Sequence, residues 1–206
     1  MMVMPFRNIV SGLFAGLLGV ASAVLPTASA YAVEEKEAGS ADGLLLSMSK
    51  EFLENSGFVS GLGLDGSKLD YSVESLKQID AALQKLHDEL PDGTDGKDLM
   101  AAGDKQLQFV TLSLGSYVGE VLRRHLKQDA RWEGFGSLSE DEKQLFGNEK
   151  DIGNAYFIRW ADGVVFPMSK VRKFLANGDE DSVYFYAKVI LKDTKQVDGD
   201  GTAASR

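Results

Sequence analysis

Residues 107–122 read LQFVTLSLGSYVGEVL, and this stretch decides how we expect the chain to fold. On a helix it places apolar side chains on nearly every side, and such a helix is usually buried in the middle of its domain. We therefore predict a long central helix from about Asp98 to Gln128. Gly115 and Gly119, one turn apart, would let another element approach its backbone closely. The apolar positions are Leu107, Phe109, Val110, Leu112, Leu114, Tyr117, Val118, Val121 and Leu122.

A polar stripe interrupts this helix. Ser113, Ser116, Glu120, Arg123 and Arg124 fall on one side when successive residues turn by about 100°. Glu120 precedes the two arginines by one helical turn, a spacing that allows ion pairs. If the helix is central, the Glu120 carboxylate is removed from water and must be neutralised by arginine or by hydrogen bonds.

Two roles for this stripe stay open. One is an internal ion pair that fixes how the helices pack, because buried charges are normally paired. The other is a pocket for a ligand or partner, lined by Tyr117, Glu120, Arg124 and Trp132, with Arg123 as a further candidate contact. A carboxylate with a perturbed pKa in a cleft would suit the second role.

Shorter helices are predicted on the N-terminal side of the central helix. Gly43–Leu53 has one apolar face, and Ser72–Leu90 repeats apolar residues in steps of three and four. Ser72 is a suitable N-cap for the second of these helices, and Pro91-Asp92-Gly93 should end it. The glycines of Gly57–Gly66 predict a loop between the two helices.

The C-terminal half is predicted to combine short helices with a hairpin. Ser139 followed by acidic residues predicts a capped helix over Ser137–Phe146. Aromatic and β-branched residues on both sides of Asp162-Gly163 predict antiparallel strands at Ala155–Trp160 and Val164–Phe166. Two more helices are predicted: Met168–Ala176, which follows Pro167 and ends at Asn177-Gly178, and Ser182–Leu191, whose pattern also fits a strand.

The first 30 residues have the pattern of a cleaved export signal. Arg7 forms a short positive region, and the apolar run Ile9–Leu25 is shorter than the about 20 residues that a membrane anchor needs. Ala28 and Ala30 form a site for signal peptidase, and Ala32 allows a second cleavage position. We therefore expect a bacterial protein that is periplasmic or secreted, with no stable membrane insertion after signal cleavage.

The mature chain is expected to hold a single α+β domain over residues 43–192. This domain should be mainly helical, with a central buried helix and a small antiparallel hairpin in its C-terminal half. Residues 31–42 are polar and acidic, which predicts a flexible leader. Residues 193–206 are rich in glycine and aspartate, which predicts a disordered tail.

The composition excludes several functional classes. The chain of 206 residues has no cysteine, which excludes disulfides, thiol catalysis and cysteine-ligated zinc. Its formal net charge is −9, and removal of Arg7 with the signal leaves 21 basic and 31 acidic residues. Such a chain lacks the basic surface with which proteins bind nucleic acid, so no nucleic-acid partner is expected.

Three motifs lack the context that their chemistry requires. Gly61–Gly66 matches the letters of the dinucleotide fingerprint but neither follows a convincing strand nor opens a helix. Ser47 and Lys50 have the spacing of serine–lysine acylases without their other motifs. Asp198–Gly201 resembles the start of a calcium loop that ends too early. We therefore expect no cofactor, no metal site and no catalytic residue that a motif identifies.

His87 and His125 are the only histidines of the chain. They are too few for a metal site of histidines and carboxylates without help. His125 is expected on the strongly apolar side of the central helix. It is either a partly buried histidine hydrogen-bonded near the helix C-terminus or a general base oriented by a carboxylate.

Several short segments follow one another in a characteristic order. They are Asp70-Tyr-Ser-Val-Glu-Ser-Leu76, Leu114-Gly-Ser-Tyr-Val-Gly-Glu-Val121, Trp132, Phe166-Pro167 before a basic helix, and Asn177-Gly178. This order, over about Leu69 to Leu191, resembles a family of small bacterial α+β domains of unknown function. The resemblance implies a fold without an established reaction and carries over no catalytic residues. Gly115, Gly119 and Glu120 match the most characteristic stretch of the family.

Small size, export, acidity and the lack of a catalytic motif predict an exported, non-catalytic binding protein. One concrete form is a periplasmic inhibitor or immunity-type protein that occupies a partner enzyme or toxin, since an acidic inhibitor can be steered to a basic enzyme. The expected partner is another protein or a small ligand in the cell envelope. Two alternatives stay open: a hydrolase of envelope polymer that uses Glu120 or His125 as acid or base, and a structural or stress-associated envelope protein.

Overall fold

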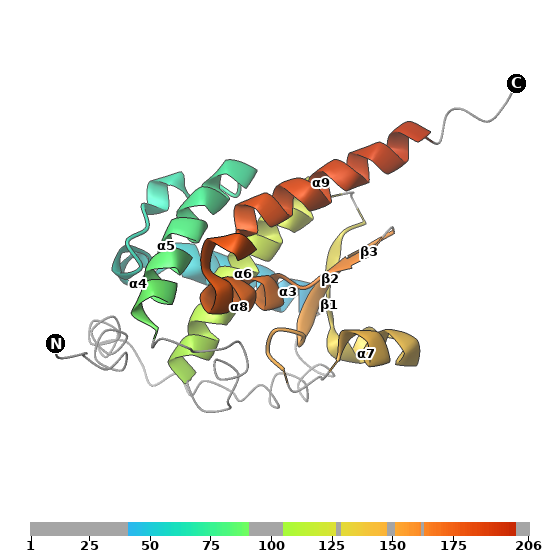
Figure 1. The fold of residues 1–206 in the computed structure, drawn as a ribbon, viewed down its shortest axis with the longest axis horizontal. Helices are drawn as coiled ribbons and strands as arrows, with labels where there is room; N and C mark the ends of the chain where they lie inside the picture. Colours follow the sequence, from blue (N-terminus) through green and yellow to red (C-terminus); the bar gives the residue numbers. More distant parts are fainter. Residues whose placement is uncertain (1–40, 91–104, 127–128, 148–150, 162, 201–206) are drawn as a thin grey trace, which may run out of the picture.

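The computed structural model describes residues 41–90, 105–126, 129–147, 151–161 and 163–200, with side chains up to residue 192. Here the chain is mainly helical, with a small antiparallel sheet in its C-terminal half, so the predicted α+β class is confirmed (Figure 1). The predicted signal, residues 1–30, lies outside the described residues. The helices are α3 (Ala41–Glu54), α4 (Ser56–Gly61), α5 (Leu76–Glu89), α6 (Lys105–His125), α7 (Glu140–Phe146), α8 (Pro167–Asn177) and α9 (Val183–Asp200).

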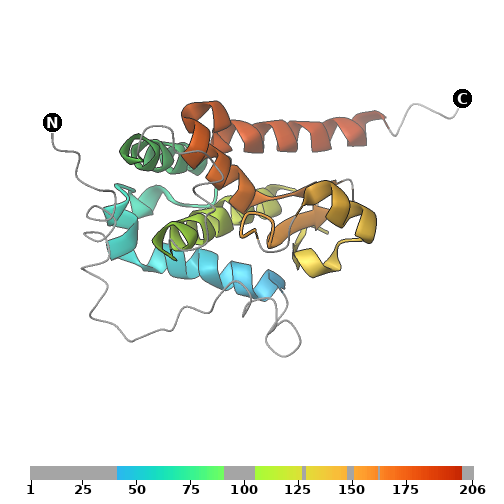
Figure 2. The same ribbon diagram turned by 60° about the horizontal axis from the view of Figure 1, so that its bottom comes forward.

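Helix α6 is the predicted central helix. Every residue from Val110 to Leu122 is buried, as its apolar composition predicted. The helix runs between α3 and α8, with α5 nearby (Figures 1 and 2). The predicted extension of this helix toward Asp98 falls on residues outside the described ones.

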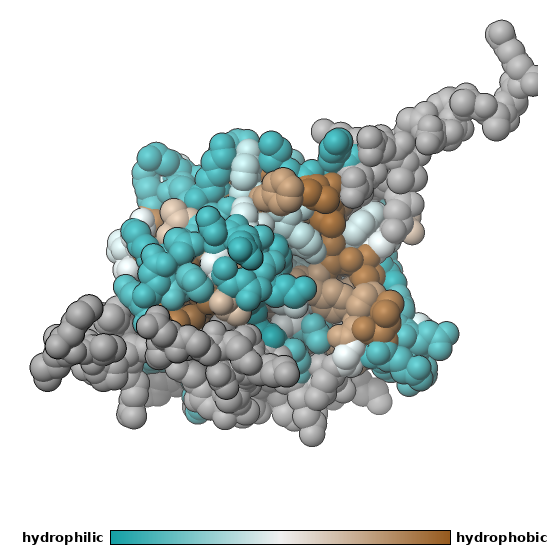
Figure 3. Space-filling view, in the orientation of Figure 1, coloured by the Kyte–Doolittle hydropathy of each residue, from teal (hydrophilic) through white to brown (hydrophobic). Residues whose placement is uncertain are grey.

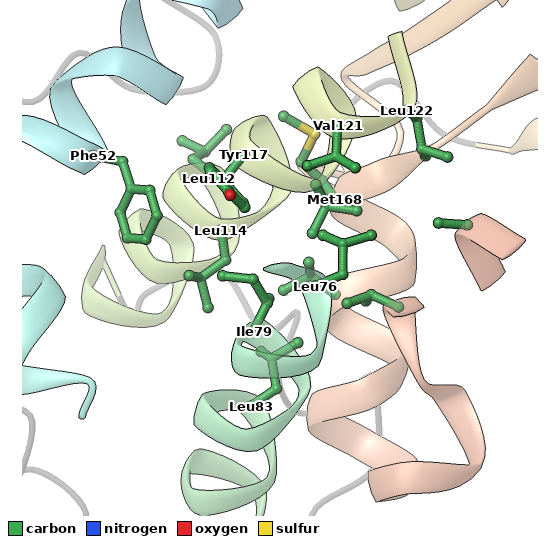
Figure 4. Close-up of a cluster of buried hydrophobic side chains, with 14 of the residues drawn as sticks. Phe52, Leu76, Ile79, Leu83, Leu112, Leu114, Tyr117, Val121, Leu122 and Met168 are labelled. Carbon is green, nitrogen blue, oxygen red and sulfur yellow. The ribbon is translucent and has the colours of Figure 1, made fainter. Parts of the chain in front are cut away.

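The main hydrophobic core forms around α6. Side chains from α3, α5, α6 and α8 meet there, including Phe52, Ile79, Leu114 and Met168 (Figure 4). The two predicted close approaches to α6 are confirmed, because the backbone at Gly115 packs against Met168 and that at Gly119 packs against Trp132. The glycines therefore let α8 and the sheet lie directly on the helix backbone.

The N-terminal helices begin and end close to their predicted positions. Ser72 caps a short 3-10 turn, Val73–Ser75, by accepting a hydrogen bond from the backbone N–H of Ser75, and α5 continues from this turn. The prediction of a loop over Gly57–Gly66 is wrong in its first half, where α4 forms. The Asn55 side chain caps α4, and burial of two apolar residues, Phe58 and Val59, holds this short helix against the core.

The sheet contains one strand more than predicted. Strands β2 (Tyr156–Trp160) and β3 (Gly163–Val165) form the predicted hairpin one residue early, because Gly163, expected in the turn, pairs with Trp160. Strand β1 (Arg131–Gly134) pairs with the other edge of β2, giving the order β1-β2-β3. A four-residue strand, RWEG, is too short and too polar for alternation alone to reveal it. It forms because β2 offers it a partner.

The register of the strands divides the sheet into two faces. Trp132 lies opposite Ile158, which lies opposite Val165, and these side chains belong to the main core. The alternate residues Phe157 and Val164 face a second, smaller cluster beneath α7. This helix starts with the predicted capping box, in which Ser139 and Glu142 satisfy each other's backbone N–H groups. Phe135–Ser137 forms a 3-10 turn between β1 and α7.

The helix predicted over Ser182–Leu191 forms the first part of α9, which then continues beyond the predicted end. It follows the 3-10 turn Gly178–Asp181 and runs from Val183 to Asp200, away from the body of the molecule (Figure 1). The prediction of a disordered tail from residue 193 is therefore corrected for residues 193–200. Once the packed first turns have nucleated a helix, each further residue adds a hydrogen bond at low cost.

Candidate functional site

The predicted polar stripe of α6 forms a closed ion-pair cluster. Glu120 is fully buried, and its two carboxylate oxygens accept hydrogen bonds from α6 and β1. Arg123 donates from Nε to Oε1 at 2.7 Å and from Nη2 to Oε2 at 3.0 Å. Arg124 Nε lies 3.4 Å from Oε2, and the indole N–H of Trp132 donates to Oε1 at 3.0 Å. The buried charge is thus paired and hydrogen-bonded, as its stability requires.

The electrostatics of Glu120 follow from these contacts. Burial raises the pKa of its carboxyl, but the hydrogen bonds from Arg123, Trp132 and Arg124 outweigh burial, so the net pKa is lowered. Glu120 is therefore ionised at neutral pH. A group that keeps its charge and whose oxygens are both engaged is poorly suited to give or take a proton during catalysis.

Next to this cluster, three side chains are stacked from the core to the surface. The ring of Tyr117, on α6, lies 5.0 Å from that of Tyr71 with 24° between their planes. The guanidinium carbon of Arg124 lies over the ring of Tyr71, 3.5 Å from its centroid. Tyr71 adopts φ +61°, the left-handed region that costs a bulky residue free energy. Hydrogen bonds from its N–H to the Tyr117 hydroxyl and from Ser49 to its own hydroxyl hold it there.

The structure brings the five predicted site residues together, but most of them are inaccessible. Tyr117 and Glu120 are fully buried and Trp132 is 2% exposed. Only Arg123 and Arg124 reach the surface. The cluster has the geometry of the first role considered for it, an internal ion pair that fixes the packing of α6 against β1. Three of its members would have to rearrange before they could contact a ligand or partner.

His125 differs from its predicted position. It is exposed rather than partly buried, and its Nδ1 lies 2.8 Å from the carbonyl oxygen of Val121, one turn earlier on α6. The helix ends at this residue, so the ring turns outward past the last buried turn instead of following Leu114 and Val118 into the core. The prediction of a hydrogen bond near the helix C-terminus is confirmed. His87 lies beside α8, with Nδ1 2.8 Å from the carbonyl oxygen of Leu175.

A second ion-pair network lies on the face of the sheet under α7. Arg159 on β2 bridges two carboxylates, Glu133 at 3.0 Å and Glu142 at 2.9 Å. Hydrogen bonds from Arg159 and from the backbone of Ser139 lower the pKa of Glu142 to about 2. This network ties α7 to the sheet.

A shallow hollow of about 270 Å³ lies between α5 and the start of α9. It is lined by Ala81, Gln84, Phe174 and Asp179 together with Asp80 and Ser182. Asp80 accepts hydrogen bonds from the Ser182 hydroxyl at 2.6 Å and from the Val183 N–H at 2.8 Å. Asp80 therefore caps the beginning of α9 from another helix.

An apolar strip crosses the molecule from α7 over β3 to α9. Leu145 is 77% exposed, Phe185 67% and Val189 39%, and they are the large apolar side chains that are exposed among residues described with side chains. Half-buried apolar side chains join them into one area. The strip consists of Leu145 and Phe146 on α7, Val164 and Phe166 at β3, and Phe185, Tyr186 and Val189 on α9.

Contacts between neighbours join the middle of this strip, from Phe146 through Phe166 to Tyr186. The rings of Phe146 and Phe166 are 5.0 Å apart, which connects α7 to the end of β3. The Tyr186 hydroxyl interacts with the backbone of Phe166, which connects β3 to α9, while burial raises the pKa of Tyr186 to about 12. In Figure 3 hydrophobic surface gathers between α9 and α7. The sequence showed that these residues are apolar, but only the packing of α9 on its opposite face leaves Phe185 and Val189 in solvent.

Comparison with known proteins gives no relative for this chain, because no family model, curated protein or solved structure matches it. Within the described residues, no helix is both long and apolar enough to span a bilayer, and no group of three metal-binding side chains comes together.

Proposed function

We propose that this chain is an exported, non-catalytic binding protein that binds another protein through the apolar strip. The observation that carries this proposal is the exposure of Leu145, Phe185 and Val189 on elements between which hydrophobic surface gathers (Figure 3). Leaving large apolar side chains in water forgoes about 2 kcal/mol of burial for each, so such a surface marks an interaction site in a soluble protein.

The chemistry of the two predicted acid–base candidates favours binding over hydrolysis. The Glu120 carboxylate is enclosed by three donors. The exposed ring of His125 is oriented by the Val121 carbonyl, and no described carboxylate contacts it.

The kind of partner follows from the charge of the chain. With 21 basic and 31 acidic residues in the mature form, two copies repel each other, as do this protein and an anionic membrane surface. A basic protein partner is attracted instead. This supports the inhibitor or immunity-type form of the proposal, in which the chain occupies an enzyme or toxin of the envelope.

The experiment compares capture from envelope extract by immobilised mature chain, Tyr31 onward, and by its variants. Phe185→Asp and Leu145→Asp place a charge in the strip, and both should abolish capture of a stoichiometric partner. Ser47→Asp is the matched control, because it adds the same charge at an exposed position of α3. Equal recovery with Phe185→Asp, Leu145→Asp and the control would overturn the proposal. Sedimentation of the free chain tests self-association, and dimerisation lost in Phe185→Asp would also overturn it.

A further inference from the structure

The outer edge of β3 lies within the apolar strip. β3 ends the strand order β1-β2-β3, so one of its edges has no neighbouring strand in the part of the chain that the structure describes. Among the described residues, no backbone hydrogen bond outside the β2–β3 ladder involves Gly163, Val164 or Val165. Free backbone groups at the edge of a sheet are a template for pairing with another strand.

The short connection between β2 and β3 determines which backbone groups face outward. Trp160 pairs with Gly163, so the connection is two residues long and the pair next to it exchanges hydrogen bonds. Bonded and non-bonded pairs alternate along an antiparallel ladder. Val165, opposite Ile158, is therefore bonded to β2, while the N–H and C=O of Val164, opposite Arg159, point away from the sheet.

Apolar side chains flank this free backbone on both sides. Val164 and Phe166 are half-buried at the edge itself. On one side Phe146 of α7 packs against Phe166, and on the other Tyr186 of α9 interacts with the backbone of Phe166. A strand placed along β3 would set its alternate side chains on this strip while its backbone pairs with Val164. A helix of the partner would also cover the strip, but it would leave the N–H and C=O of Val164 unpaired.

Acidic residues at the border of the strip favour basic side chains on the partner segment. The first turn of α7 carries the exposed Asp141 and Glu140, whose side chain is 85% exposed and pairs with Lys143 at 2.8 Å. Arg159, the basic residue opposite Val164, is already paired with Glu133 and Glu142. Basic side chains on an incoming strand would therefore meet acidic neighbours and an acidic protein.

We infer that an extended segment of the partner protein, with apolar and basic residues in alternation, adds to β3 as a fourth strand. This inference rests on the proposed function, because it specifies how the partner occupies the apolar strip. The backbone of Val164 supplies the pairing, and the strip receives the apolar side chains.

The test uses a defined peptide and the full mature chain. The probe is an acetylated, amidated heptapeptide in which lysine and valine alternate, labelled for fluorescence anisotropy. In a strand, successive N–H groups point to opposite edges, so methylation of the valine nitrogens or of the lysine nitrogens blocks one edge at a time. We expect saturable binding that falls about tenfold for one methylated isomer and not for the other, the value of one lost hydrogen bond.

Two variants of Val164 test the contribution of its backbone N–H to the same pairing. Val164→Pro removes the N–H, and proline is tolerated on an edge strand where the N–H faces solvent. Val164→Thr keeps the N–H and the branched shape. We expect Val164→Pro to weaken peptide binding by about tenfold and Val164→Thr to leave it nearly unchanged. Circular dichroism checks the fold, and if Val164→Pro is unfolded, the methylated peptides still decide the question on the unmodified protein.

The outcomes separate this inference from the proposed function. No binding of the peptide, or equal binding of all isomers, would overturn strand addition. If Phe185→Asp nevertheless abolishes capture of a partner from envelope extract, the proposed function stands without it. If Phe185→Asp and Leu145→Asp leave capture unchanged, the proposed function fails whatever the peptide does.

Discussion

The indole N–H of Trp132 donates a hydrogen bond to the buried carboxylate of Glu120 at 3.0 Å. The same ring lies against the bare backbone of Gly119, the residue before Glu120 on α6. The backbone N–H of Trp132 in turn donates to Asp42 of α3 at 3.0 Å. One aromatic residue therefore joins the central helix, the sheet and α3. Its hydrogen bond also stabilises the charge of Glu120, which is the one fully buried glutamate among the described residues.

Replacement of Glu120 by glutamine should destabilise the fold without affecting partner binding. The arginines would keep their positive charges beside a neutral amide, and breaking a buried pair usually costs about 3–5 kcal/mol. Because Arg123 and Arg124 are 26% and 38% exposed, water relieves part of this penalty, and we expect about 2 kcal/mol. Denaturant unfolding measures the change, with Glu140→Gln as an exposed control. Equal midpoints for the two variants would show that the cluster is not structural.

Introduction of a Cβ at Gly119 should disrupt the contact between α6 and β1. In Gly119→Ala the new methyl group would overlap the Trp132 ring, and such overpacking typically costs about 1–3 kcal/mol. Gly57→Ala is the control, because the nearest atom lies 3.7 Å from a Cβ built there. Unfolding curves and tryptophan fluorescence should change for Gly119→Ala alone. Normal stability in that variant would contradict the packing described for Trp132.

Glu142 should make stability depend on pH in the acid range. Its folded-state pKa of about 2, lowered first by the hydrogen bond from Arg159, lies below its ordinary value of 4.5. The contribution of Glu142 to stability is therefore fully present above about pH 4.5 and is lost as the pH falls through about 2. An NMR titration of the carboxyl should give this low pKa, and Arg159→Gln should raise it. An ordinary pKa in the unmodified protein would show that the ion pair does not form.

Removal of the Asp80 carboxylate should loosen the start of α9. Asp80→Ala leaves the Val183 N–H and the Ser182 hydroxyl without their partner, and loss of a helix cap costs about 1–2 kcal/mol. Hydrogen exchange in the first turn of α9 should become faster. Asp88→Ala serves as control, because this exposed aspartate on the same helix binds only Gln84 among the described residues. Similar exchange in both variants would show that α9 does not depend on this cap.

Local patterns in the sequence predicted most of the helices and several of their caps. Three such predictions are confirmed: the burial of the helix over residues 107–122, the N-cap at Ser72 and the capping box at Ser139. They could be predicted because each depends on residues within one or two turns of each other. The spacing of Glu120 to the two arginines likewise predicted their ion pairs. Strand β1 and helix α4 were missed because their stability comes from β2 and the core, not from their own residues.

The amino-acid sequence alone thus determined the central helix, the charge pairs along it and the glycines that let other elements approach it. Only the tertiary structure decided that Tyr117, Glu120 and Trp132 are closed off and that Phe185, Val189 and the edge of β3 remain open. Helical periodicity and capping act between residues close in the chain. Exposure depends on which distant elements pack against each face, and apolar residues such as Leu114 and Phe185 look alike until that packing is known.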